Sequence, residues 1–245
     1  KSEVLAINDN GSSIYNYDDK VNFQIDQSNM EDYISIAKEI NDRKDIKLVN
    51  IQHEFGIFGG DAGAHLLPFL EKVKKPVVVT LHSVVPAPDE HKKRIVNTIF
   101  RKASAVVVMA KESVRILKED YGVNDSSKIF FVPHGVPQVQ FNPENSKDKV
   151  HLENRIILST FGLMNKGKGI EYVIRALPSI VRKFPQVIYL VIGETHPQVR
   201  KKEGESYRNS LVKLVEELGL SDNVRFYNKY LTLAEIIAYL NATDV

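Results

Sequence analysis

The sequence feature that most constrains the fold is a regular alternation of short apolar runs with longer stretches of helical periodicity. Strands that alternate with helices along a chain form parallel sheets whose two faces are covered by those helices. The alternation therefore predicts an α/β protein. Strands are expected over residues 3–8, 21–25, 47–52, 76–81, 105–109, 129–132, 155–160, 187–192 and 224–227, and helices over 30–41, 64–73, 90–102, 111–121, 170–182, 206–218 and 232–241.

Composition narrows the class further. With 245 residues the chain is long enough for one large or two modest domains, and it contains no cysteine. The lack of cysteine excludes a disulfide framework, a thiolate zinc site and a cysteine nucleophile, and it fits a reducing compartment such as the cytoplasm. The formal charge of +2 is too small to indicate a nucleic-acid partner. No apolar run has the length of a membrane span, and none of the seven histidines has metal-ligand spacing.

A polar, proline-bearing segment divides the predicted elements into two groups. We expect an N-terminal domain over residues 1–137, an interdomain linker over 138–154 and a C-terminal domain over 155–245. Three strands in the second group leave apolar helix faces uncovered, so this domain is predicted to be incomplete. Because the first residue is Lys1 instead of Met, we also expect the chain to be an excerpt.

The strand, turn and helix between residues 156 and 176 predict a phosphate site. Glycines allow backbone angles closed to other residues, and the free N–H groups of a helix start favour anions. Lysines in such a turn add positive charge. The alternative is an ordinary α/β turn with solvated lysines. The residues concerned are Gly162, Lys166, Gly167, Lys168 and Gly169.

The same turn satisfies most of a P-loop, because Gly162 is followed five residues later by Gly167 and then Lys168. The P-loop requires a Ser or Thr next, to bind Mg²⁺, and this chain has Gly169. A nucleotide triphosphatase is therefore the weaker interpretation.

Ionisable side chains also follow two strands of the N-terminal domain. His53 and Glu54 open a loop that contains Gly59 and Gly60, and His82 ends the strand over 76–81. Open α/β sheets bind ligands at the carboxyl ends of their strands. The alternative for the loop is simple packing of its aromatic residues, and for His82 a half-buried imidazole bonded to a loop carbonyl.

Several motifs in the order in which they occur resemble the family-4 retaining glycosyltransferases, which have two facing Rossmann-like domains, the GT-B fold. The resemblance covers nearly the whole chain. It is carried by His82, the turn 132–136, the loop from Gly162 to Gly169, the strand end at Gly193 and Glu194, and residues 222–226.

This resemblance implies roles for the candidate residues. Lys168 matches the lysine that contacts the diphosphate of a nucleotide-sugar donor, and Gly162 opens the loop around that diphosphate. Gly193 and Glu194 match the strand end near the nucleoside. The family's arginine after the first glycine is replaced here by Leu163, a loss that Lys166 or an arginine from elsewhere would have to make good.

On the acceptor side, the resemblance implies that His82 lies near the sugar and steadies the reacting centre. The loop with His53, Glu54, Gly59 and Gly60 matches a loop that faces the acceptor, a saccharide or a lipid. No covalently bound cofactor and no metal are implied, since the nucleotide-diphosphate sugar is a substrate.

Two further expectations concern charge and completeness. The family's pair of acidic residues would lie beyond Val245 and its first glycine-rich loop before Lys1, so we expect the chain alone to be inactive. The run 200–203 is expected to be a solvated, mobile surface. Basic residues that either solubilise helices or give peripheral contact with an anionic membrane are Lys72, Lys74, Lys75, Lys92, Lys93 and Arg94.

Three function classes thus stay open. The leading one is a retaining hexosyltransferase that uses a nucleotide-sugar donor. The others are a P-loop nucleotide hydrolase and a non-catalytic module that binds a sugar nucleotide.

Overall fold

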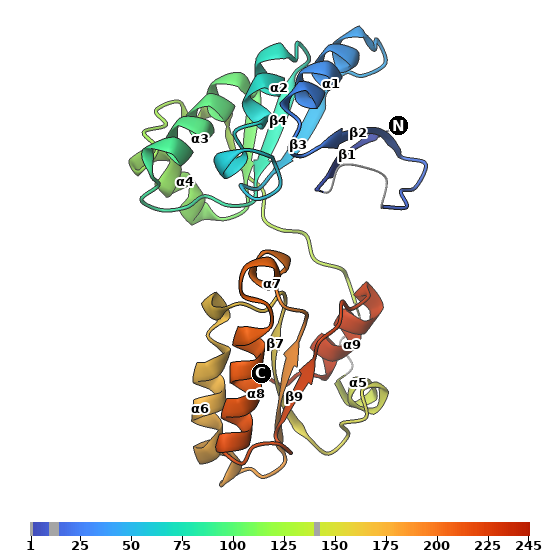
Figure 1. Ribbon diagram of the computed structural model, residues 1–245, viewed down its shortest axis with the longest axis vertical. Helices are drawn as coiled ribbons and strands as arrows, with labels where there is room; N and C mark the ends of the chain where they lie inside the picture. The colour runs from blue at the N-terminus through green and yellow to red at the C-terminus, as the bar shows by residue number, and fades with distance from the viewer. Residues whose placement is uncertain (1, 10–14, 140–142) are drawn as a thin grey trace. The chain divides into compact units, whose positions relative to one another are not determined.

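The computed structural model describes residues 2–9, 15–139 and 143–245. The chain divides into two compact units, an N-terminal unit over Lys1–Val136 and a C-terminal unit over Pro137–Val245 (Figure 1). Each has parallel strands and covering helices, so the α/β prediction is confirmed.

The N-terminal unit is built on a parallel four-stranded sheet in the order β3-β4-β5-β6. A separate parallel pair, β1-β2, lies beside it. Helices α1, α2 and α3 lie side by side (Figure 1). The bounds are β1 (Val4–Asn8), β2 (Val21–Asp26), α1 (Met30–Asp42), β3 (Val49–His53), α2 (Leu66–Lys72), β4 (Val77–Leu81), α3 (Glu90–Lys102), β5 (Ala105–Val108), α4 (Lys111–Glu119) and β6 (Ile129–Phe131).

Side-chain N-caps mark where helices α1 and α3 begin. The side chain of Asn29 accepts a hydrogen bond from the backbone N–H of Glu31 at the start of α1, and the side chain of Asp89 accepts one from Lys92 at the start of α3. Such caps satisfy amides that have no partner in the first turn. Helix α1 then buries one face against the core of the unit.

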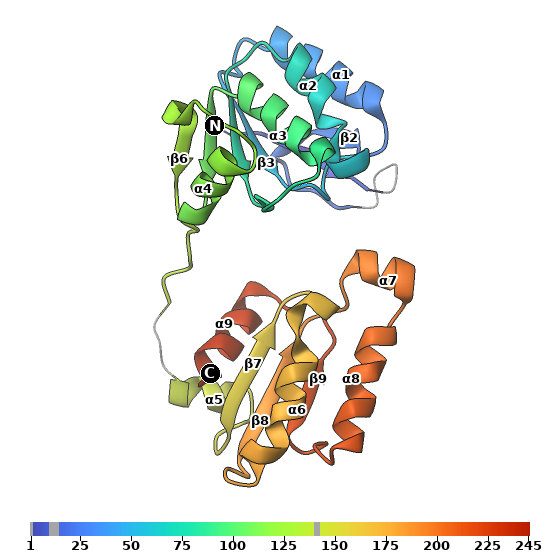
Figure 2. The ribbon, with the colours of Figure 1, turned by 90° about the vertical axis from the view of Figure 1, so that its left-hand side faces the viewer.

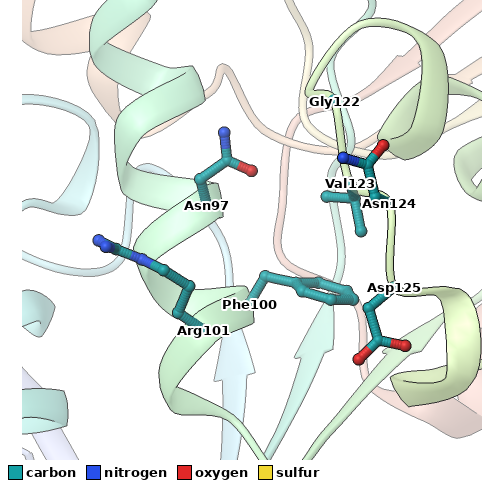
Figure 3. Close-up of a pocket in the computed structure, with 7 residues that line it drawn as sticks. All are labelled: Asn97, Phe100, Arg101, Gly122, Val123, Asn124 and Asp125. Carbon is teal, nitrogen blue, oxygen red and sulfur yellow. The ribbon is translucent and has the colours of Figure 1, made fainter.

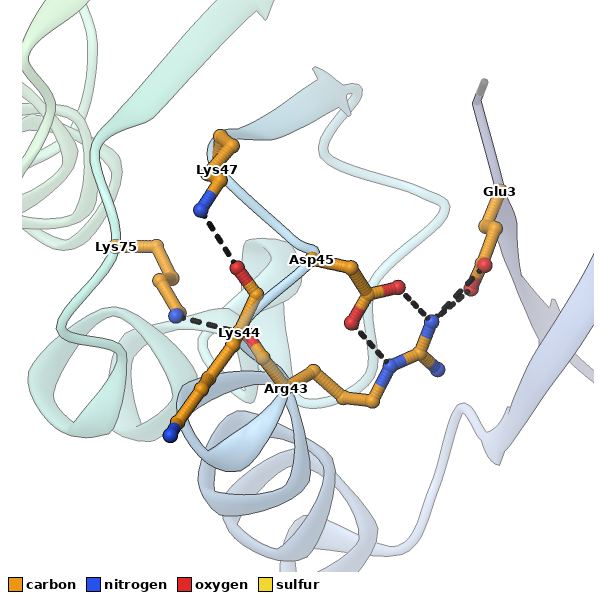
Figure 4. Close-up of polar contacts among 6 residues, drawn as sticks. All are labelled: Glu3, Arg43, Lys44, Asp45, Lys47 and Lys75. Atoms are coloured by element: carbon orange, nitrogen blue, oxygen red, sulfur yellow. Dashed lines mark hydrogen bonds and ion pairs between the residues drawn. The ribbon is translucent and has the colours of Figure 1, made fainter.

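Arg43, just after α1, ties the β1-β2 pair to the rest of the unit (Figure 4). Its Nη2 donates to Glu3 Oε1 at 3.0 Å and its Nε to Asp45 Oδ1 at 2.8 Å. The guanidinium also lies 5.7 Å from the centre of the Phe23 ring on β2. The hydrogen bond from Arg43 holds the pKa of the Asp45 carboxyl well below its usual range.

The C-terminal unit contains a parallel sheet in the order β7-β8-β9. Figure 2 shows α6 and α8 on one face of this sheet and α9 on the other. The bounds are α5 (Pro143–Lys149), β7 (Ile156–Phe161), α6 (Ile170–Val181), β8 (Val187–Ile192), α7 (Pro197–Glu203), α8 (Ser206–Glu217), β9 (Val224–Tyr227) and α9 (Leu233–Ala242).

The central strand β8 shows why helices pack on both faces of this sheet. All six of its residues are buried, and alternate residues of a strand point to opposite faces. Val187, Tyr189 and Val191 pack in the cluster that includes α6 and α8. Their neighbours Ile188 and Leu190 pack in the cluster that includes α9. A strand buried on both faces is typical of a parallel sheet.

Two segments expected to be irregular form helices, and the first corrects the expected linker. The segment 138–154, expected to be a linker, contains α5, which packs against α9. Leu152 is buried there, and Lys147 Nζ bonds to the Asp244 carboxylate at 2.7 Å. The run 200–203, expected to be a solvated, mobile surface, is exposed and lies in α7. Long-range contacts stabilise both helices, which their polar sequences alone do not predict.

Candidate functional site

The turn between β7 and α6 carries the predicted phosphate-site residues. Strand β7 ends at Phe161 and α6 begins at Ile170, with a 3-10 turn over Lys166–Lys168 between them. Gly162 has a φ of 119° and Gly169 a φ of 62°, both in the region that favours glycine. These two glycines let the chain leave the strand and enter the helix within a short loop.

A second turn, after β8, rests directly on the first. Gly193 has a φ of 135°, and a Cβ there would lie 2.3 Å from the carbonyl oxygen of Gly162. No larger residue fits at position 193 without moving the backbone. The Gly162 N–H donates to the Ile192 carbonyl at 3.0 Å. The structure thus brings the predicted residues Gly162 and Gly193 together at the carboxyl ends of neighbouring strands.

The two lysines of the turn have different surroundings. The Nζ of Lys168 lies over Gly162, 3.3 Å from the position of a Cβ built on that glycine. Lys168 is exposed, and among the described residues it has no ion-pair partner. Lys166 instead places its Nζ 3.4 Å from the carboxylate of Glu203 on α7. One cation is therefore free over the turn and the other is paired.

Glu194 also has a partner on α7. Its carboxylate lies 3.4 Å from Nη1 of Arg200, whose Nε donates to Glu205 at 2.7 Å. Glu194 and Lys166 are thus both engaged by the α7 segment, an arrangement for which the residue pattern holds no signal.

This turn has the chemistry of an anion site. The first N–H groups of a helix have no intrahelical acceptor, and the helix dipole adds partial positive charge at that end. Lys168 contributes a full charge to the same region. A helix start, an unpaired ammonium and close-packed glycine backbone suit a phosphate group.

The candidate residues of the N-terminal unit lie at the carboxyl ends of β3 and β4. His53 is the last residue of β3 and His82 follows β4 directly, and the His82 N–H donates to the His53 carbonyl at 2.9 Å. The His82 ring is exposed, with Nε2 2.8 Å from Oε1 of Gln52. Its partner is a side chain, so the expected alternative of a half-buried ring bonded to a carbonyl does not hold.

His53 is placed very differently from His82. Its side chain is 0% exposed, and neither ring nitrogen has a hydrogen-bond partner among the described residues. The ring stacks on Phe58 and meets Phe55 edge-on, with centroids 5.7 and 5.2 Å away. Burial lowers the pKa of His53 to about 4, so the imidazole is neutral at neutral pH. His53 therefore packs the loop instead of facing a ligand.

The remaining loop residues divide between the surface and the core. Glu54 accepts a hydrogen bond from Ser83 Oγ at 2.6 Å, beside His82. Gly59 is buried, and a Cβ on it would lie 1.7 Å from the carbonyl oxygen of Gln27. Gly60 has a φ of 75° and sits against His65. The two glycines are thus required by packing, while Glu54 joins His82 at the strand ends.

Sequence reasoning missed two partners at these strand ends, Gln52 and Gln27. Gln52 bonds to His82, and Gln27 Nε2 donates to the carbonyls of Gly56 and Ile57 at 3.1 and 2.8 Å. Strand alternation points Gln52 outward and offers a weak signal. Nothing in the sequence relates Gln27 to a loop about 30 residues away.

A surface pocket lies elsewhere in the N-terminal unit (Figure 3). It is lined by the last turns of α3 and the loop before β6, so it is at the amino ends of the strands. None of the candidate residues lines it. Its residues are Asn97, Phe100, Arg101, Gly122, Val123, Asn124 and Asp125.

Two features of the described residues concern metal binding and membrane insertion. Across residues 2–9, 15–139 and 143–245, no three His, Asp or Glu side chains gather closely enough to hold a metal ion. Within the same ranges, none of the helices has both the length and the apolar character needed to cross a bilayer. Two of the lysines considered for membrane contact have partners: Lys75 bonds to the Arg43 carbonyl (Figure 4) and Lys92 pairs with Asp89.

The family-model match lies in the C-terminal unit. Residues 141–245 match the family model described as glycosyl transferases group 1. An uncharacterized glycosyltransferase of Methanocaldococcus jannaschii is 28% identical over 123 residues, which are 49% of this chain and 31% of that protein. One subunit of the Arabidopsis thaliana phosphatidylinositol N-acetylglucosaminyltransferase is 27% identical over 128 residues, 48% of this chain and 28% of that protein.

Structural comparison covers both units. The crystal structure of Anabaena HepE in complex with UDP and glucose superposes with a TM-score of 0.68 at 16% identity, covering 90% of this chain and 58% of that one. A glycosyltransferase from Rickettsia africae gives a TM-score of 0.64 at 17% identity, covering 91% and 58%. The trehalose-6-phosphate synthase OtsA gives 0.60 at 13% identity.

These comparisons agree on the fold, although the matched regions span about a third of the curated relatives and somewhat more than half of the solved chains. The α/β, Rossmann-like architecture is that of GT-B glycosyltransferase structures. The C-terminal unit thus matches the glycosyl transferases group 1 model, and the chain shares its fold with GT-B glycosyltransferase structures.

Proposed function

We propose that this chain is part of a retaining glycosyltransferase that moves a hexose from a nucleoside-diphosphate sugar to a saccharide or lipid acceptor. The observation that carries the proposal is the turn over 162–169, where exposed Lys168 lies above Gly162 at the start of α6. The family match over residues 141–245 supports the same assignment.

In this proposal the C-terminal unit holds the donor. Glycosyl transfer needs stabilisation of the leaving diphosphate, and the charge of Lys168 with the first amides of α6 supplies it by preorganised electrostatics. Gly162 and Gly193 keep side chains away from the backbone that approaches the phosphates. Lys166 and Glu194 complete the proposed donor-binding set.

The N-terminal unit, over about residues 1–137, is proposed to serve the acceptor. Exposed His82 is the proposed catalytic residue, with its ring oriented by Gln52. Glu54, bonded to Ser83, is the proposed polar contact for an acceptor hydroxyl. Buried His53, Gly59 and Gly60 shape the loop that carries Glu54.

Comparisons suggest the first ligands to try. HepE is crystallised with UDP and glucose, so a UDP-sugar is the first donor. The name of the Arabidopsis relative refers to phosphatidylinositol, which keeps lipid acceptors beside saccharides. A peripheral location at a membrane in the cytoplasm is the corresponding proposal for the whole protein.

A P-loop hydrolase is disfavoured by the same turn. The position that needs a Mg²⁺-binding hydroxyl is Gly169, whose φ of 62° a Ser or Thr rarely adopts. Replacing Gly169 by Ser or Thr, to supply the missing Mg²⁺-binding hydroxyl, would therefore strain the backbone.

The test is calorimetric titration with UDP, GDP, ADP and ATP, each with and without Mg²⁺. We expect one diphosphate to bind tightest, with little dependence on metal. Lys168→Ala should weaken that binding by about 1.5–3 kcal/mol, the range for a charge-assisted hydrogen bond.

The matched control is Lys183→Ala, an exposed lysine after the far end of α6. It removes the same charge but should leave affinity within about twofold, because exposed charges beyond a Debye length are screened. Equal losses in the two variants would remove Lys168 from the site. Tight binding of ATP only with Mg²⁺ would favour the hydrolase instead.

A further inference from the structure

Helix α7 brings a carboxylate to the candidate donor turn. Glu203, its last residue, lies 3.4 Å from Nζ of Lys166, and both side chains are partly open to solvent. Lys168, two residues further along the same turn, has no such partner among the described residues. An acid that engages one of two cations in an anion site competes for the positive charge that a ligand needs.

Backbone contacts fix where α7 starts relative to the turn. The Met164 N–H donates to the Glu194 carbonyl at 2.7 Å, and the His196 N–H returns a bond to the Met164 carbonyl at 3.0 Å. Met164 is buried, as is Thr195, its partner in this parallel bridge. The chain therefore enters α7 from a strand-like contact with the turn itself.

Side-chain contacts fix the other end of α7. Arg200 bonds to Glu194 before the helix and to Glu205 after it, and Thr195 Oγ1 also donates to Glu205. Gly204, with a φ of 62°, ends the helix and donates its N–H to the Arg200 carbonyl at 3.0 Å. With both ends held, α7 keeps the Glu203 backbone close to the turn, and its carboxylate reaches Lys166 at 3.4 Å.

We propose that Glu203 is a built-in competitor for the ligand, occupying Lys166 until a nucleoside diphosphate displaces it; this inference rests on the proposed function. A carboxylate contributes one negative charge, whereas a diphosphate carries more and can also use Lys168 and the α6 amides. The diphosphate therefore displaces Glu203, while a singly charged anion does so less well. Glu203 thus lowers affinity and favours ligands with several charges.

The test compares Glu203→Gln with the wild-type chain in calorimetric titrations with UDP. The substitution removes the charge and keeps the shape, so UDP should bind about two- to fivefold tighter, the range that an exposed ion pair spans. Glu216→Gln, an exposed glutamate on α8 with no ion-pair partner among the described residues, makes the same change in net charge and should leave UDP affinity unchanged.

A second test, in the Lys166→Met variant, distinguishes displacement of Glu203 from a direct effect of its charge on the ligand. In Lys166→Met, Glu203 has no ammonium to occupy, so adding Glu203→Gln should give no more gain than adding Glu216→Gln. A gain that persists in this background would show that Glu203 acts directly on the ligand and overturns the inference.

The remaining outcomes distinguish the two proposals. Equal UDP affinity in Glu203→Gln and Glu216→Gln overturns the competitor while leaving the donor site in place. If none of the nucleotides binds the wild-type chain or Glu203→Gln, the proposed function fails and the competitor fails with it.

Discussion

The loop over residues 53–60 and the turn over 162–169 look alike in sequence and differ in structure. Both follow a strand of a parallel sheet, and both contain glycines and ionisable groups. In the first, Gly59 faces the Gln27 carbonyl and His53 is buried between aromatic rings. In the second, Lys168 stands exposed over Gly162. A glycine shows that something approaches the backbone, and only the structure shows whether that is protein or open space.

The first experiment tests the packed loop over residues 53–60, where the largest loss of stability is expected. Gly59→Ala would put a methyl group 1.7 Å from the Gln27 carbonyl oxygen, so the backbone has to move. Overpacking of this kind should lower the free energy of unfolding by about 3 kcal/mol or more. Urea unfolding followed by circular dichroism measures it.

Its control lies in the same loop. A Cβ added to Gly56 would have no atom within 4 Å, and the φ of this residue is outside the glycine-favouring region. Gly56→Ala should therefore change stability by no more than about 0.5 kcal/mol. Similar losses in both variants would mean that Gly59 is no more tightly packed than Gly56.

The second experiment uses pH to probe the buried histidine. The pKa of His53 falls from 6.5 to about 4 on folding, chiefly through burial, with the Glu54 charge opposing the shift and His82 adding to it. Above pH 6.5 the imidazole is neutral in both states and contributes nothing. As the pH falls from 6.5 towards 4, the unfolded state binds a proton that the folded state does not bind, so the free energy of unfolding decreases.

The total loss should approach about 3 kcal/mol at about 1.4 kcal/mol per pKa unit. His53→Leu fills the same space without ring nitrogens, so it should flatten the stability profile between pH 6.5 and 4. An unchanged slope in the variant would assign the acid sensitivity to other groups.

The smallest effect is expected in the open turn. A Cβ on Gly167 would meet only the Asn165 side-chain oxygen, at 3.0 Å, and that side chain can turn away. Gly167→Ala should therefore change the free energy of unfolding by no more than about 0.5 kcal/mol. A loss of about 3 kcal/mol in urea unfolding would show that this turn is as tightly packed as the loop with Gly59.

Much of the fold was predictable because local signals and burial agree. The helix over 90–102 and the strands over 187–192 and 224–227 have the predicted bounds. A capping box of Thr232 and Glu235 starts α9, within one residue of the predicted bound. In these segments the periodicity of the apolar residues matches the face that the structure buries.

The misses share one physical cause, which is contact between distant residues. Helix α5 depends on a bond from Lys147 to Asp244, 97 positions away. Helix α7 contacts the turn after β7 through Glu203, whose carboxylate pairs with Lys166. The candidate residues were found where a strand ends, but whether each is buried, paired or free depends on partners that sequence spacing does not identify.

The β1-β2 pair, held by Arg43 and by buried Phe23 and Ile25, has a consequence for amide hydrogen exchange. A two-stranded sheet is not stable by itself in water, so these strands stay formed only while they are docked. Their amides should exchange through a partial opening that leaves β3 to β6 protected. The N-terminal unit would then open in two steps, and loss of the Arg43 contacts would speed only the first.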